Sequence, residues 1–151
     1  MAKLNIIKFG DPLLRKTARP VEAITPRITT LLDDMIETMR DAGGCGLAAP
    51  QVGILRRIAV IEVDEGTVYE LINPKIIAYS GEQRETEGCL SNPGAYGITK
   101  RPKSVRVRAT DRHGKEYELR GTDLLARAIC HECDHLDGKL YTDVQIKAIE
   151  E

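Results

Sequence analysis

Several residue types that carry much of protein chemistry are scarce in this chain of 151 residues. It has no Trp, one Phe, three His and four Cys. Positive charge is not in excess either, because 22 Lys and Arg stand against 23 Asp and Glu. This balance excludes the basic domain that is typical of nucleic-acid-binding proteins, so we expect no direct nucleic-acid partner.

Long apolar segments are also missing. No run approaches the roughly 18 apolar residues of a membrane-spanning helix, so no membrane association is expected. The first ten residues lack the apolar core of a signal peptide and the Arg/Ser-rich composition of a transit peptide. We therefore expect a cytoplasmic protein with reduced thiols. Its length and its ordinary content of 42% apolar and 30% charged residues predict one globular domain over residues 1–151.

The spacing of apolar residues predicts two helices that flank a region of strands. The first helix covers residues 26–40, with Thr25 as its cap, Pro26 in its first turn and glycines just beyond its end. The second covers residues 123–137, with Thr122 as its cap. The apolar residues expected to face the core from this second helix are Leu124, Leu125, Ala128, Ile129, Cys133 and Leu136.

Short β-type runs fill the middle of the chain. Strands are predicted at residues 58–61, 69–73, 75–79, 104–110 and 116–120, with Pro74 ending the second of them and a hairpin turn at residues 111–115. The order of elements predicts an α+β fold. In it, mainly antiparallel strands pack around a central C-terminal helix, and a further helix lies near the N-terminus.

The second predicted helix carries a His-Glu-x-x-His motif. His131 and His135 are four residues apart and so lie about 40° apart around a helix axis, which lets both imidazoles reach one metal ion. Glu132 lies beside them and can act as a general acid and base. The motif therefore predicts a metal site on this helix.

Two cysteines flank the first histidine but point elsewhere. Cys130 lies about 120° from the metal face and Cys133 nearly opposite to it. We interpret both as small apolar residues packed against the sheet. A redox dithiol is disfavoured by their position within a helix, and a structural zinc site lacks a second cysteine pair.

The third metal ligand is left open by spacing alone. Glu150 and Glu151 lie in a tail that we expect to fray, and His113 falls in the predicted hairpin turn, where solvent is its expected partner. Cys89, between Gly88 and a Pro/Gly-rich stretch, is the remaining candidate. Nothing in its spacing joins it to the two histidines.

Three segments in this order resemble the signature motifs of the peptide deformylase family. The segments are 44–53 (GCGLAAPQVG), 87–91 (EGCLS) and 131–138 (HECDHLDG), and residues 12–15 (PLLR) agree as well. The resemblance covers roughly residues 5–145. It implies removal of the formyl group from the N-terminal formyl-methionine of newly synthesised proteins, by attack of a metal-bound hydroxide on the formyl carbonyl.

The resemblance also implies a role for each matching residue. Cys89, His131 and His135 would be the metal ligands, and Glu132 the acid and base. The Gln51 side-chain amide and the Leu90 backbone N–H would stabilise the oxyanion. Gly46 would pair with the substrate backbone, while Cys45, Leu90 and Ala128 would border the methionine pocket.

The metal and the partners follow from the same resemblance. One thiolate and two imidazoles favour zinc by default, whereas the family implies Fe2+, with Zn2+, Ni2+ or Co2+ as substitutes and with loss of activity in air as Cys89 oxidises. The family usually has Gln where this chain has Cys130, and we expect altered packing there without loss of a ligand. The segment after Tyr141 is short, which leaves docking at the ribosome exit region open.

Two other functions are compatible with the helix motif alone. One is an endopeptidase that uses the same His-Glu-x-x-His residues. The other is a metal-stabilised domain without catalysis, which would lose thermal stability on chelation and turn over no substrate.

Overall fold

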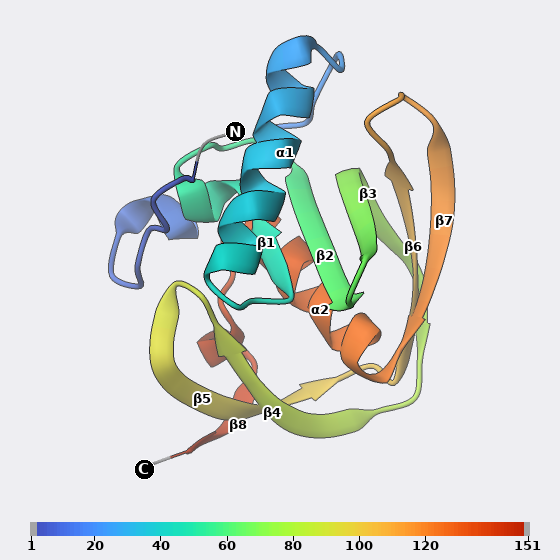
Figure 1. Cartoon of the computed structure of the whole chain (residues 1–151). Coiled ribbons are helices and arrows are strands. Elements are labelled where there is room, and N and C mark those ends of the chain that lie inside the picture. Colours follow the sequence, from blue (N-terminus) through green and yellow to red (C-terminus); the bar gives the residue numbers. More distant parts are fainter. Residues whose placement is uncertain (1–2, 150–151) are drawn as a thin grey trace.

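The fold consists of two antiparallel sheets and two α-helices in a computed structural model that describes residues 3–149 (Figure 1). A five-stranded sheet has the order β1-β2-β3-β6-β7 and a three-stranded sheet the order β4-β5-β8. The helices are α1 (Pro26–Asp41) and α2 (Asp123–Leu136), and 3-10 turns lie at η1 (Pro12–Arg15), η2 (Ala49–Val52) and η3 (Tyr141–Asp143). The strands are β1 (Gly46–Ala48), β2 (Ile58–Asp64), β3 (Thr67–Ser80), β4 (Gln83–Cys89), β5 (Asn92–Arg101), β6 (Ser104–Thr110), β7 (Glu116–Thr122) and β8 (Gln145–Ile149).

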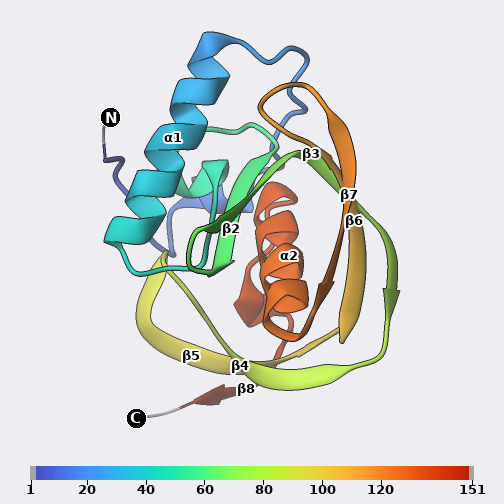
Figure 2. The same cartoon turned by 45° about the vertical axis from the view of Figure 1, so that its right-hand side comes forward.

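Strand β2 explains why the large sheet has a helix on each face. Neighbouring side chains in a strand point to opposite faces of the sheet. The first four residues of β2 are all buried, so both faces of the sheet are covered at this strand. Ile58 and Val60 pack with Met35 and Met39 of α1, whereas Ala59 and Ile61 pack with residues of α2 such as Ile129. Figure 2 shows α2 enclosed by the strands and α1 on the outer side. The predicted α+β fold around a C-terminal helix is therefore confirmed.

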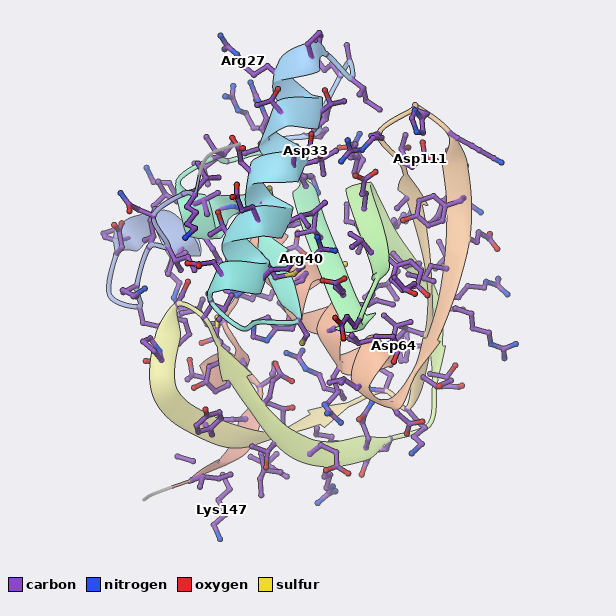
Figure 3. The ribbon with its side chains drawn as sticks, viewed as in Figure 1. Arg27, Asp33, Arg40, Asp64, Asp111 and Lys147 are labelled. Carbon is purple, nitrogen blue, oxygen red and sulfur yellow. The ribbon has the colours of Figure 1, made fainter. Side chains whose placement is uncertain are left out.

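The second sheet closes the other side of α2. Strands β4 and β5 form a long hairpin that curves past this helix, and β8 pairs with β5 near the C-terminal end of the described chain (Figures 1 and 2). Charged side chains surround the outside of the molecule, among them Arg27, Asp33 and Arg40 of α1 (Figure 3). α2 therefore lies between the two sheets. The side chains on the face of α2 that is turned toward β4 face the hairpin of β4 and β5.

Several boundaries differ from the sequence-based prediction. Strand β3 continues through Pro74, because an irregularity in its pairing with β6 between Ile72 and Lys75 absorbs the proline. Neither Thr25 nor Thr122 forms a side-chain cap, although both stand at the N-cap positions. Leu124 is 43% exposed and does not face the core. The expected fraying of Glu150 and Glu151 lies outside the described residues.

Candidate active site

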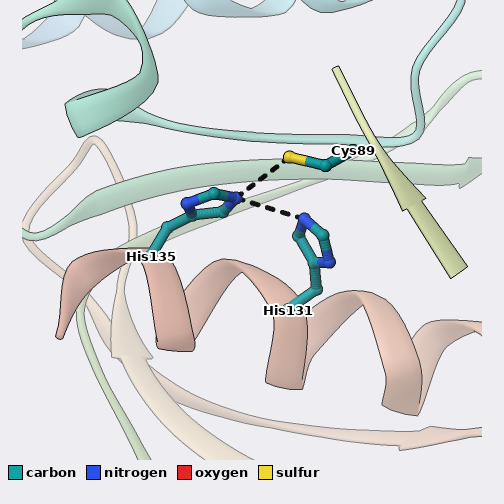
Figure 4. Close-up of side chains that lie close together, drawn as sticks. All are labelled: Cys89, His131 and His135. Atoms are coloured by element: carbon teal, nitrogen blue, oxygen red, sulfur yellow. Dashed lines mark hydrogen bonds between the residues drawn. The ribbon is translucent and has the colours of Figure 1, made fainter. Parts of the chain in front are cut away.

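Three donor atoms converge where α2 meets the end of β4. Cys89 Sγ lies 3.3 Å from His135 Nε2, which lies 3.2 Å from His131 Nε2 (Figure 4). All three atoms lie within 4.8 Å of one another. The structure thus brings together the two histidines that helical spacing paired and the distant cysteine that spacing could not connect to them.

Cys89 reaches the helix because of the hairpin that carries it. It is the last residue of β4 and pairs with Asn92 across the turn to β5, after a shift in register between Glu87 and Cys89. Gly88 occupies the shifted position, and a Cβ there would collide with the ring of Tyr96. The end of this strand therefore holds the Cys89 sulfur within 3.3 Å of His135 Nε2.

The ring of His131 is held by a buried ionic network. Its Nδ1 lies 2.6 Å from Glu87 Oε2, and Arg101 binds the same carboxylate through Nε at 3.2 Å and Nη2 at 2.8 Å. Thr99 Oγ1 donates to Glu87 Oε1 at 2.8 Å, and Arg101 Nη1 donates to Asp134 Oδ2 at 2.6 Å. Burial alone would raise the pKa of Glu87, but hydrogen bonds from His131 and Arg101 outweigh it and lower the pKa to about 2.

Burial and nearby charges shift the pKa values of the two cluster histidines in opposite directions. Burial opposes charge on His131, but the negative charges around it outweigh burial and raise its pKa. Burial and the neighbouring His131 lower the pKa of His135, which favours a neutral imidazole. A neutral imidazole and a thiolate are the forms in which these residues bind metals.

Glu132 is the acidic neighbour of this cluster. It is 3% exposed, its Oε1 has no hydrogen-bond partner among the described residues, and burial raises its pKa to about 7. A Cβ at Gly46 would collide with Glu132 Oε2. The sequence suggested that Gly46 leaves room for a peptide, and the structure shows that it also leaves room for this carboxylate.

Gln51 is 1% exposed and its side chain contacts Cys89. Its Oε1 accepts the Ala48 N–H at 2.9 Å, which fixes the orientation of the amide. Its Nε2 then donates to Ser91 Oγ at 3.0 Å and to Cys89 Sγ at 3.4 Å. The amide donors of Gln51 are therefore directed at the turn that carries Cys89 and Leu90.

A pocket of about 470 Å³ opens beside the cluster. It brings together the four residues expected to contact substrate, which are Cys45, Gly46, Leu90 and Ala128. His131, Glu132 and Cys89 form part of its wall, whereas Gln51 and His135 are not among the residues that line it. Leu124 and Arg127 also line the pocket and were not predicted to do so, because helical periodicity placed Leu124 in the core and gave Arg127 no role.

The remaining histidine and cysteines behave as the sequence predicted. Cys130 and Cys133 are buried in the core with Ile129 and Leu136, and neither belongs to the three-residue cluster. Burial raises the pKa of the Cys130 thiol to about 11. His113 is exposed in the turn between β6 and β7. Ser91, Thr99 and Arg101 were missed, because their roles depend on side-chain contacts with residues that are far away in the sequence.

A helix that presents His-Glu-x-x-His to a cysteine on a neighbouring hairpin is the arrangement of a metal-dependent hydrolase. The polypeptide deformylase family model matches residues 3–150, and the chain belongs to that family. The family is metal-dependent, and its members are amidases that act on N-formyl-methionine peptides. Among the described residues, no helix is long and apolar enough to cross a bilayer.

Individual relatives support this assignment. The chain is 58% identical to a peptide deformylase of Lachnoclostridium phytofermentans over 145 residues, which are 95% of this chain and 89% of the relative. The solved structure of the Thermotoga maritima peptide deformylase has a TM-score of 0.93 at 37% identity, covering 96% of this chain and 99% of that one. The Ehrlichia chaffeensis enzyme in complex with actinonin has a TM-score of 0.93 at 38% identity, with coverages of 95% and 89%.

This membership decides between the three functions compatible with the motif. The chain is a hydrolase that removes the formyl group from the N-terminal formyl-methionine of newly synthesised peptides. Neither an endopeptidase nor a domain without catalysis is favoured.

Proposed function

We propose that Cys89, His131 and His135 hold the metal ion of this deformylase and that Glu132 is its acid and base. The observation that carries this proposal is the convergence of one sulfur and two Nε2 atoms beside a buried carboxylate with an unpartnered oxygen. His131 Nδ1 donates a hydrogen bond to Glu87, which leaves the lone pair of His131 Nε2 directed at the cluster. The donor set therefore fits a single metal ion.

The metal would supply one piece of chemistry when bound, because coordination lowers the pKa of a water molecule to about 7. The protein must then move protons and stabilise charge. As water adds to the formyl carbon, Glu132 takes a proton from it and later delivers a proton to the methionine nitrogen. The formyl C–N bond breaks, and the products are formate and a free α-amine.

Negative charge develops on the formyl oxygen during this reaction. We assign its stabilisation to the Gln51 side-chain amide and the Leu90 backbone N–H. Gln51 Nε2 already lies at the turn that carries Leu90, and its orientation is fixed by Ala48. Loss of one such donor typically lowers the rate by about 10²–10³.

The substrate is proposed to bind as an extended strand along β1. Among the described residues β1 pairs with β2 alone and lies at the edge of its sheet, and Gly46 at its start and the preceding Cys45 line the pocket. The methionine side chain would then enter the pocket between Cys45, Leu90 and Ala128.

Fe2+ is the proposed physiological metal, with Zn2+, Ni2+ or Co2+ able to replace it. The donor set of one thiolate and two imidazoles binds any of these ions. Because its substrates are nascent chains, we propose that the enzyme acts in the cytoplasm, and docking at the ribosome exit region stays an open alternative.

Formate release from formyl-Met-Ala by anaerobically prepared protein tests the proposal. We expect turnover together with about one equivalent of iron, and inhibition by actinonin. Glu132→Gln should retain the metal and lose turnover. Unchanged turnover in that variant would remove Glu132 from the mechanism. Cleavage of internal peptide bonds, or metal binding without formate release, would instead support one of the two functions that the family membership does not favour.

A further inference from the structure

An arginine without a counter-charge lines the pocket next to the cluster. Arg127 lies on α2 one turn before His131 and is half-buried. Within residues 3–149 its side chain makes one hydrogen bond, from Nη1 to Gln83 Oε1 at 2.8 Å, and no ion pair. Since the guanidinium is permanently charged, the wall of the pocket carries a full positive charge.

The single partner of Arg127 positions it without neutralising it. Gln83 is buried, and its Nε2 donates to the carbonyl oxygens of Pro102 and Asp123, each at 2.9 Å. These two bonds fix the amide so that Oε1 faces Arg127. A guanidinium has five N–H donors and Gln83 accepts one of them, so the remaining donors are available to a ligand.

The acidic residues that line the pocket do not neutralise this charge. Glu87 is bound by His131 and by two nitrogens of Arg101. Glu132 faces Gly46 in the buried cluster. An anionic group of a bound substrate would therefore meet an open positive charge.

The geometry of an extended peptide indicates which residue carries that anion. Alternate side chains of a strand point to the same side, so the first and third residues share a face. Arg127 is adjacent on α2 to Ala128, which belongs to the proposed methionine pocket. We infer that Arg127 is a specificity-determining residue that favours formylated chains with Asp or Glu at position three. This inference rests on the substrate orientation proposed above.

Two capped peptides test the inference directly. For formyl-Met-Ala-Glu-amide over formyl-Met-Ala-Gln-amide, we expect the iron-loaded enzyme to show a kcat/KM ratio of about two to five at low salt, the range of a partly exposed ion pair. The ratio should fall as salt rises. Formyl-Met-Glu-Ala-amide should show no such advantage over its Gln counterpart, because its charge lies on the opposite side of the strand.

Variants assign the effect to this one side chain. Arg127→Met should remove the preference for Glu, Arg127→Lys should keep most of it, and Arg127→Glu should reverse it in favour of Lys at position three. Arg120→Met is the matched control, because Arg120 is exposed on β7, outside the pocket, and forms no ion pair among the described residues. Equal kcat/KM for the two peptides, or a preference that survives Arg127→Met, would overturn the inference.

Binding of the deformylated peptides separates this inference from the proposed function. Met-Ala-Glu-amide should bind the wild-type protein more tightly than Met-Ala-Gln-amide by a similar factor, and Arg127→Met should bind both equally. This measurement needs no turnover. A protein that discriminates the products but releases no formate contradicts the proposed function alone, and a protein that releases formate without discriminating contradicts the role of Arg127 alone.

Discussion

The ring of Tyr141 stacks against the ring of His131, with centroids 6.2 Å apart and planes inclined by 21°. The same side chain is 2% exposed, and its hydroxyl accepts a hydrogen bond from Asn92 Nδ2 at 3.1 Å. Phe9, the only phenylalanine in the chain, packs against it in a tilted arrangement with ring centroids 5.8 Å apart. Tyr141 therefore contacts both the helix that carries the histidines and the hairpin that carries Cys89.

Removing this ring should cost much more than removing its hydroxyl. Tyr141→Phe loses one hydrogen bond, and we expect a loss of about 0.5–1.5 kcal/mol in the free energy of unfolding. Tyr141→Ala leaves a cavity and should lose about 3–5 kcal/mol. Urea unfolding followed by circular dichroism measures both values. Equal stability of the two variants would show that the ring contributes no packing.

Gly46→Ala should impair catalysis through Glu132. The new methyl group would collide with the Glu132 carboxylate and displace it, so we expect formate release to fall by at least about tenfold. The double variant Gly46→Ala, Glu132→Gln should be no slower than Glu132→Gln alone, because both changes act on the same group. Additive losses in this cycle would place the effect of Gly46 elsewhere.

Arg101→Met should be among the most destabilising single changes in the chain. Arg101 is 6% exposed and bridges Glu87 and Asp134, so its loss leaves a buried carboxylate without its main counter-charge. We expect a loss of about 3–5 kcal/mol in the free energy of unfolding. The matched control is Arg108→Met, which removes exposed ion pairs to Glu116 and Glu118 and should cost less than about 1 kcal/mol. Similar losses in both variants would argue against a special role of the buried network.

Acid should weaken the contact between Glu62 and Arg40. Hydrogen bonds from Arg40 and from the Gly66 N–H lower the pKa of Glu62 to about 2, below its ordinary value of 4.5. A lowered folded-state pKa gives stability that is fully present above pH 4.5 and is lost as the pH falls toward 2. The stability difference between wild type and Glu62→Gln should therefore shrink over this range. A difference that stays constant with pH would contradict the assignment.

Thiol labelling should separate the cysteines by exposure. Cys45 is exposed, whereas Cys89, Cys130 and Cys133 are buried. We expect a small thiol reagent to modify one residue of the native protein, and all four only after unfolding. Mass spectrometry identifies the modified site, and Cys45→Ala should abolish native labelling. Rapid labelling of Cys133 in the native protein would contradict its place in the core.

Local patterns were sufficient for the elements whose residues are close in sequence. The helix over residues 26–41, the hairpin from β6 to β7 and the pairing of His131 with His135 follow from spacing of three and four residues or from alternation. Strands β4, β5 and β8 were not identified individually. The sequences of β4 and β5 contain glycines and several charged residues, β8 is only five residues long, and the three strands are stabilised by pairing with one another. Cys89 could be joined to the helix only by family resemblance, because the hairpin that positions it is set by tertiary contacts.

The origin of the three ligands has a consequence for stability. Cys89 belongs to the small sheet, while both histidines belong to a helix that packs on the large sheet. A metal ion held by all three would act as a cross-link between these layers, closing the long chain segment between Cys89 and His131 much as a disulfide closes a loop. Because such an ion binds the folded chain better than the unfolded one, the unfolding temperature would rise with free metal concentration. The melting curve of this protein would then serve as a measure of its occupancy.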